Sequence, residues 1–190
     1  MAIDWQFVEE RLLAHSMAEI QSFARDHIDE SFSFCAYHAV HYEGYFQLCF
    51  DTPSNSLAVA QRTEREAINR RVKMLSTNEA WRGATYFTTD PAVMDYGQET
   101  GEFAYCLPTE IQFNEVHDLF ISGNHPRGEE ADDEYFEGST RIVLWRVLER
   151  LIAAHVFDNL KLASPFRVGY QLSGNELVVM RILNWPSLAE

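Results

Sequence analysis

The chain has 190 residues, of which 46% are hydrophobic and 13% are aromatic, and this is enough apolar material for the core of one domain. Its formal net charge of −14 argues against binding to nucleic acid or to an anionic membrane surface. The first residues lack the basic and apolar regions of a signal peptide, and no apolar stretch approaches the roughly 20 residues of a membrane span. The three cysteines show no CxxC spacing, so we expect reduced thiols in a soluble, cytoplasmic protein.

Residues 4–28 are expected to form the first helix, because apolar residues recur there at helical spacing and Asp4 can cap the free amides of the first turn. The next stretch, residues 31–50, is rich in aromatic and small residues and is interrupted around Gly44. This pattern predicts a β-hairpin. Alternation along its first strand predicts that four side chains share one face: Phe32, Phe34, Ala36 and His38.

Residues 56–76 are expected to form a second helix with a thin apolar stripe. Its other faces carry five of the fifteen basic residues of the chain: Arg62, Arg65, Arg70, Arg71 and Lys73. A charged run of this kind is most often a solvated helix face, and two glutamates on the same helix partly offset it.

Residues 77–109 contain two candidate short strands, one that begins at Trp81 and one over residues 102–107. Residues 110–121 fit either a short helix or an extended segment, and a helix is the preferred prediction. From residue 122 to 138 the composition shifts to glycine, proline and acidic residues, which predicts a loop. A connection of this length is uncommon in a compact domain, so the segment is a candidate for a functional role.

A third long helix is expected over residues 139–157, where apolar residues surround most of the cylinder and predict a central, well-covered helix. Residues 166–172 and 176–183 alternate as the two strands of a second hairpin. This order of elements predicts one α+β domain, residues 1–190, with a mostly antiparallel sheet built from hairpins and three long helices packed on it. The core is expected to contain six residues: Phe32, Phe34, Phe46, Leu48, Trp145 and Leu148.

Two framework segments carry a resemblance to a known family. The first helix leads into an aromatic strand, Phe32-Ser-Phe-Cys-Ala-Tyr, and the last strand ends in the pair Leu183-Asn184. In these features, which lie mainly within residues 1–60 and 139–186, the chain resembles the bacterial domain of unknown function numbered 4303. The function of that family is undefined, so the resemblance implies no catalytic or binding residue. Small acidic α+β bacterial proteins of this kind often neutralise toxins by binding them. This is an analogy with a kind of protein and does not follow from particular residues.

No strong catalytic motif occurs, because the chain lacks a phosphate-binding loop, GxGxxG, HExxH, GxSxG and a paired CxxC. His38 and His41 flank the first turn, close enough to share a metal if the turn curls. Further ligands would be needed, for which the candidates are His117, Asp118 and His125. A spacing of three on a strand places the two histidines on opposite faces, so we expect no metal and no cofactor. Cys35 lies among phenylalanines, where burial suppresses a nucleophilic role.

The acidic run over residues 129–137 is the most suggestive feature. It lacks the alternating ligands and the turn glycine of a calcium loop, so a contact surface for a basic partner is the better interpretation. Aromatic side chains among carboxylates are typical of protein interfaces. We therefore predict partner binding through seven residues: Glu129, Glu130, Asp132, Asp133, Glu134, Tyr135 and Phe136. The basic helix over residues 56–76 leaves an alternative, because the acidic run could dock there within the same chain.

These observations favour a non-enzymatic protein-binding module with an acidic surface, of the immunity or antitoxin type, whose partner is a basic protein such as a toxin or nuclease domain. No catalytic residue is assigned. One alternative is a small metal-dependent or histidine-using hydrolase built on His38, His41 and His117. Another is an oligomeric subunit whose aromatic surplus forms an interface. The sequence leaves the identity of the partner and the oligomeric state open.

Overall fold

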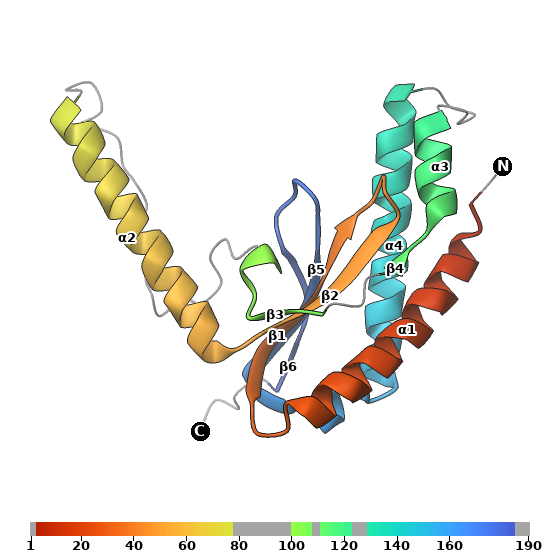
Figure 1. Cartoon of the computed structure of the whole chain (residues 1–190), viewed down its shortest axis with the longest axis horizontal. Helices are drawn as coiled ribbons and strands as arrows, with labels where there is room; N and C mark the ends of the chain where they lie inside the picture. The colour runs from red at the N-terminus through yellow and green to blue at the C-terminus, as the bar shows by residue number, and fades with distance from the viewer. Residues whose placement is uncertain (1–2, 78–99, 108–110, 123–128, 185–190) are drawn as a thin grey trace, which may run out of the picture.

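The computed structural model describes residues 3–77, 100–107, 111–122 and 129–184, without the side chains at positions 64, 67, 70–77, 122 and 129–133. In this part of the chain a six-stranded mixed sheet is covered on one face by three helices, and a fourth helix leaves the sheet on its other side (Figure 1). The predicted α+β class with a mostly antiparallel sheet is therefore confirmed. None of the described helices is long and apolar enough to cross a membrane.

Two antiparallel hairpins form the middle of the sheet. β1 (Ser31–Val40) pairs with β2 (Tyr45–Asp51), and β5 (Lys161–Leu172) pairs with β6 (Val178–Leu183), as the sequence predicts. The hairpins join through β1 and β5, which run parallel, so the sheet is mixed. A parallel pair needs a long crossover, and here most of the helices lie in the chain between β1 and β5.

Two short strands extend the sheet beyond β2. β3 (Tyr105–Cys106) and β4 (Ile111–Gln112) both pair antiparallel with β2, and the strand order is β3-β2-β1-β5-β6 with β4 also beside β2. The strand predicted over residues 102–107 is thus a 3-10 helix, η2 (Thr100–Glu102), followed by β3. The candidate strand that begins at Trp81 lies outside the described residues.

α1 (Trp5–Asp26) and α4 (Glu129–Ala153) cover one face of the sheet, and α3 (Asn114–Ser122) lies beside the first turns of α4 (Figure 1). α1 begins as predicted, because Asp4 Oδ1 accepts a hydrogen bond from the Phe7 amide at 3.0 Å. The segment around residue 111, which fitted either a strand or a helix, contains both, since β4 is followed directly by α3.

An irregularity corrects the predicted face of the first strand. The pairing of β1 with β5 is irregular between Phe32 and Phe34, and these two side chains lie on opposite faces of the sheet. The main core, between the sheet and the helices, contains four of the six predicted core residues: Phe32, Phe46, Leu48 and Leu148. Phe34 belongs instead to a small cluster on the opposite face, together with Ala36, Cys49 and Phe103.

α4 begins ten residues earlier than predicted, at Glu129, so the loop predicted over residues 122–138 is wrong from residue 129 onward. Carboxylates in the first turns of a helix are favoured by the positive end of its dipole, and Phe136 extends the buried apolar stripe about two turns beyond Val143. The helix ends at Ala153 and is followed by η3 (Val156–Asn159).

α4 is covered on one side only, which corrects the prediction of a central helix. Its buried apolar side chains share one face: Phe136, Val143, Leu144, Val147, Leu148 and Leu151. Trp145, predicted to lie in the core, is 45% exposed. Neighbouring residues of a helix are about 100° apart, so an apolar residue next to the buried stripe can still face solvent.

α2 (Pro53–Thr77) begins three residues before the predicted start, with proline at its first position and with Thr52 Oγ1 accepting a hydrogen bond from the Asn55 amide at 3.2 Å. Val59 and Ala60 are buried near this end. The rest of the helix extends away from the sheet, as Figure 1 shows. Only α1 and α4 of the three predicted long helices therefore lie along the sheet.

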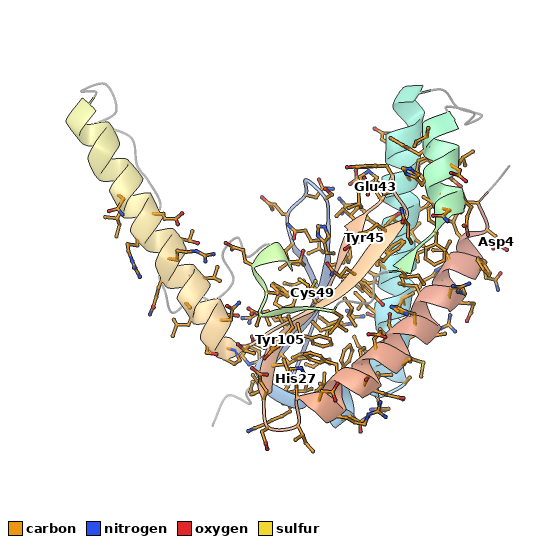
Figure 2. All side chains as sticks on the ribbon, viewed as in Figure 1. Asp4, His27, Glu43, Tyr45, Cys49 and Tyr105 are labelled. Carbon is orange, nitrogen blue, oxygen red and sulfur yellow. The ribbon has the colours of Figure 1, made fainter. Side chains whose placement is uncertain are left out.

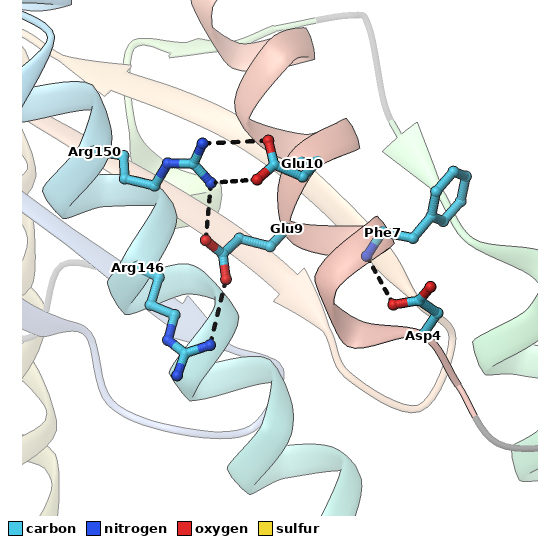
Figure 3. Close-up of polar contacts among 6 residues, drawn as sticks. All are labelled: Asp4, Phe7, Glu9, Glu10, Arg146 and Arg150. Carbon is cyan, nitrogen blue, oxygen red and sulfur yellow. Dashed lines mark hydrogen bonds and ion pairs between the residues drawn. The ribbon is translucent and has the colours of Figure 1, made fainter.

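Two arginines of α4 bind two glutamates of α1 where the helices meet (Figure 3). Arg150 Nη1 lies 2.9 Å from both Glu9 Oε1 and Glu10 Oε1, and Arg146 Nη1 lies 3.6 Å from Glu9 Oε2. The hydrogen bond from Arg150 lowers the pKa of Glu10. Glu10 and the two arginines are exposed, whereas Glu9 is buried between the helices.

Candidate functional site

The sheet face opposite the main core, which we call the second face, carries a group of polar and thiol side chains. Alternate residues of a strand point to opposite faces, and β2 sends Phe46, Leu48 and Phe50 into the main core. The same alternation directs Gln47, Cys49 and Asp51 to the second face. Figure 2 labels Cys49 near the middle of the sheet and Tyr105 on the neighbouring β3.

Three polar side chains connect η2 to this face. Gln171 Oε1 of β5 accepts two hydrogen bonds from Thr100, one from the amide at 2.7 Å and one from the hydroxyl at 2.8 Å. His38 Nδ1 of β1 lies 2.9 Å from the same hydroxyl oxygen. Because the hydroxyl proton is directed at Gln171, we assign His38 Nδ1 as the donor to Thr100. The arrangement fixes η2 over the sheet and holds one imidazole in a defined tautomer.

Cys49 of β2 and Cys106 of β3 lie directly opposite each other. The Leu107 amide donates to the Leu48 carbonyl at 2.9 Å, one position beyond the cysteines, so the cysteines occupy a non-hydrogen-bonded pair. Opposite side chains approach most closely at such positions. Cys49 is buried and Cys106 is exposed, and Cys106 Sγ lies 3.4 Å from the Thr100 carbonyl oxygen, to which it donates.

The two thiols are close enough to shift each other's pKa. Hydrogen bonding from Cys49 lowers the pKa of Cys106 to about 7, whereas the same bond and burial raise the pKa of Cys49. Sequence reasoning missed this pair because the two residues lie far apart in the chain. The signal that was present is one cysteine in each of two predicted short strands.

Asp51, at the end of β2, is fully buried and bonded to three donors. Its Oδ1 accepts from Asn55 Nδ2 at 2.7 Å and from the Ala104 amide at 3.1 Å, and its Oδ2 accepts from Ser56 Oγ at 2.5 Å. A buried carboxylate needs hydrogen-bond partners, and these donors satisfy both of its oxygens. The contacts tie β2, the start of α2 and the segment before β3 together, so we assign Asp51 a structural role.

The predicted partner-binding residues lie at the start of α4. The side chains of Glu129, Glu130, Asp132 and Asp133 lie outside the described residues. Glu134 is exposed, as a recognition role requires.

The two aromatic residues of the run face inward instead. Phe136 has no exposed surface and packs against Trp5 and Phe120 at ring-centroid distances of 6.5 and 5.7 Å, so it belongs to the core and cannot meet a partner in this fold. Tyr135 is half-buried, and its hydroxyl accepts a hydrogen bond from Trp5 Nε1 at 2.9 Å.

The candidate metal ligands and nucleophile are dispersed. His38 lies on the second face, whereas His41 is buried at the hairpin turn beside the ring of Tyr42. In the part of the chain that the structure describes, no three His, Cys, Asp or Glu side chains come together as metal ligands, and His125 lies outside that part. Cys35 points into the main core, where burial raises its pKa and removes its nucleophilic form.

The acidic run at the start of α4 does not dock on the basic helix, α2. α2 and the first turns of α4 lie at opposite sides of the molecule, separated by the sheet (Figure 1). Arg62 instead pairs with Glu102 of η2, and Arg65 is exposed. The side chains of Arg70, Arg71 and Lys73 lie outside the described residues.

A further surface, which the sequence interpretation missed, runs along the outer side of α4 beside β6. Ile142 and Trp145 are 54% and 45% exposed there. Arg181 of β6 lies over the Trp145 ring at 5.9 Å from its centroid, and its Nε lies 3.0 Å from Glu149 Oε1. We call these residues, with Glu134, the α4–β6 surface. The sequence does contain an indication of this surface. At helical spacing, residues 142 and 145 lie on a different side of the helix from Leu144 and Leu148.

The outer edge of β6 is unpaired by any strand in the described ranges, because β6 stands last in the strand order. Met180 is the extra residue of a β-bulge, since Arg181 pairs with Val168 and Val179 pairs with Gly169. A bulge interrupts the row of edge groups and discourages edge-to-edge pairing of two sheets.

Comparison of the chain with protein-family models, with curated proteins and with solved structures gives no match.

Proposed function

We propose that this chain is a protein-binding module that recognises a basic polypeptide segment on the α4–β6 surface. The observation that supports it most is the exposure of Trp145 and Ile142 side by side on a helix whose other large apolar side chains, among those described, are buried or half-buried. A single exposed apolar residue is ordinary, but tryptophan is among the residues most enriched at the energetic centres of interfaces.

The charge of the chain favours a basic partner over a second copy. The formal net charge is −14, and five carboxylate residues occupy positions 129–134 at the start of α4. Glu134 precedes Trp145 by about three helical turns, or about 16 Å, on nearly the same side of the helix. Two copies would bring like charges together on this surface, whereas a basic segment would lie between the aromatic anchor and the carboxylates.

This proposal keeps the predicted acidic surface and replaces its aromatic anchors, because Phe136 is buried and Trp145 is exposed. The carboxylates speed encounter with the partner, and Trp145 slows dissociation. Inhibition of a basic toxin or nuclease domain, which the sequence suggests by analogy, is one form of this function.

The proposal is tested with a displayed library of random peptides that is selected on the whole chain and then assayed one peptide at a time. We expect the selected peptides to be enriched in Lys and Arg, and Trp145→Ala to weaken their binding about tenfold or more. Phe7→Ala is the matched control, because Phe7 is also 45% exposed and also lies near an arginine, with Arg11 Cζ 5.7 Å from its ring centroid. It should leave binding unchanged.

A second arm replaces Glu129, Glu130, Asp132, Asp133 and Glu134 by their amides. The association rate should fall and lose most of its salt dependence, while the dissociation rate stays nearly constant. Peptides without basic enrichment, or peptides that bind Trp145→Ala as tightly as the parent, would contradict the proposal. Self-association that Trp145→Ala abolishes would identify the occupant as a second copy and would also contradict it.

A further inference from the structure

We propose that Cys49 and Cys106 form a redox-active dithiol that closes to an intramolecular disulfide when a hydroperoxide oxidises Cys106. The proposal is independent of partner binding, because the two cysteines lie on the second face of the sheet and the α4–β6 surface lies beside the helix layer.

The register of β2 and β3 places the two cysteines where a disulfide can form. They are direct partners at a non-hydrogen-bonded position, as the bond from the Leu107 amide to the Leu48 carbonyl shows. Opposite Cα atoms at such positions are typically about 4.5 Å apart, which lies within the range of about 4.4–6.8 Å that disulfides span. The strands therefore need little movement for the bond to close.

The exposures of the two thiols assign their roles. Cys106 is exposed on a short strand at the edge of the sheet, so a dissolved oxidant reaches it first. Cys49 is completely buried beneath it and is positioned to resolve the oxidised form. Cys35, the third thiol, points to the opposite face of the sheet in the main core and is excluded from the reaction.

The hydrogen bond from Cys49 supports the nucleophilic role of Cys106. It lowers the pKa of Cys106 to about 7, so about half of this thiol is ionised at neutral pH. The protonated Cys106 donates to the Thr100 carbonyl at 3.4 Å and loses this bond on ionisation, so the neighbouring Cys49 thiol has to offset that loss.

The chemistry balances with one hydroperoxide per disulfide. The Cys106 thiolate attacks the terminal oxygen of the hydroperoxide, the O–O bond breaks, and the departing alkoxide or hydroxide takes up a proton, which leaves a sulfenic acid on Cys106. The Cys49 thiol then loses its proton and attacks the Cys106 sulfur, and the sulfenic oxygen leaves as water. Two thiols lose two electrons in total, and the hydroperoxide gains them. A dithiol reductant reverses the bond by exchange.

Hydrogen peroxide and the full-length chain provide the test. We expect the intact mass to fall by two hydrogens, and peptide mapping after thiol blocking to place one disulfide between Cys49 and Cys106. Cys35→Ala is the control and should give the same bond at the same rate. Cys49→Ser should instead accumulate a sulfenic acid on Cys106 that a dimedone probe captures.

A second measurement begins with the wild-type chain, so its first result does not depend on how well a variant folds. Iodoacetamide should alkylate Cys106 of the wild-type chain with a half-maximal rate near the pKa of about 7. Cys49→Ala removes the donor and should move this midpoint upward, toward the usual cysteine value of about 8.5. Disulfide-linked dimers through Cys106, a bridge that includes Cys35, or a sulfenic acid that persists in the wild-type chain would overturn the proposal.

Discussion

Under α1 and α4 the sheet buries a continuous apolar cluster that reaches from Val8 to Met180, whereas the described part of the second face buries only Phe34, Ala36, Cys49 and Phe103 as a cluster. Much of the rest of the second face is polar. Asp51, Thr100 and Gln171 are all buried there and all hydrogen-bonded.

This difference predicts how a single substitution affects stability on each face. In the main core it should act by removing side-chain volume, and on the second face it should act by removing a hydrogen-bond partner. Apolar contacts are non-directional, so the main core responds to lost volume and tolerates changes of shape. A buried polar group that loses its partner incurs its full desolvation cost, so the second face should respond to changes that keep volume constant.

The largest effect should follow from truncating the main core at Phe136. Phe136→Ala removes a fully buried ring and should lower the free energy of unfolding by about 3–5 kcal/mol. Trp145→Ala, on the same helix, should cost about 1 kcal/mol, because Trp145 is 45% exposed and mainly loses its contact with Arg181. Urea denaturation of both variants measures the contrast, and equal losses would place Trp145 in the core after all.

Most of the main core follows from the sequence, and its exceptions have clear causes. Helical spacing and strand alternation correctly place Phe46, Leu48 and Leu148 in it. The same spacing fails for Trp145, because apolar residues on both sides of a helix hide which side is buried. Phe136 was missed because five nearby carboxylate residues made its segment resemble a loop.

The second face should be most sensitive at Asp51. Asp51→Asn keeps the side-chain volume but replaces one accepting carboxylate oxygen by a donating amide group, in a site that supplies three donors. The substitution should therefore lower the free energy of unfolding by about 2–3 kcal/mol. Asp4→Asn is the matched control, because Asp4 is an exposed N-cap and asparagine caps a helix about as well. Thermal melting of the two variants compares them, and similar small shifts would show that the second face does not depend on this carboxylate.

A smaller effect is expected at Thr100. Thr100→Val removes a hydroxyl that His38 and Gln171 share, and it should cost about 1–2 kcal/mol. Thr140→Val is its counterpart on α4, since Thr140 is 1% exposed and its hydroxyl has no hydrogen-bond partner among the described residues. That variant should be neutral or slightly stabilising. Destabilisation by Thr140→Val that equals the loss at Thr100 would remove the distinction between the two sites.

The contacts of the second face could not be derived from the sequence. His38, Thr100 and Gln171 come from the first strand, a 3-10 turn and the fifth strand, and their meeting depends on the parallel pairing of β1 with β5. Local patterns give the two hairpins but not how the hairpins join. The Cys49–Cys106 pair was hidden for the same reason, because it needs the pairing of β3 with β2.

The smallest effect should arise at Glu10, whose exposed carboxylate binds Arg150 (Figure 3). The hydrogen bond from Arg150 lowers the pKa of Glu10 in the folded chain, so its contribution to stability is present above the unfolded pKa of about 4.3. It is lost as the pH falls through the lowered folded pKa. Glu10→Gln should therefore lower the melting temperature by no more than about 2 °C at pH 7, and the difference should shrink in high salt. Below the folded pKa parent and variant should melt together, and a difference that persists there would show that Glu10 acts through packing and not through its charge.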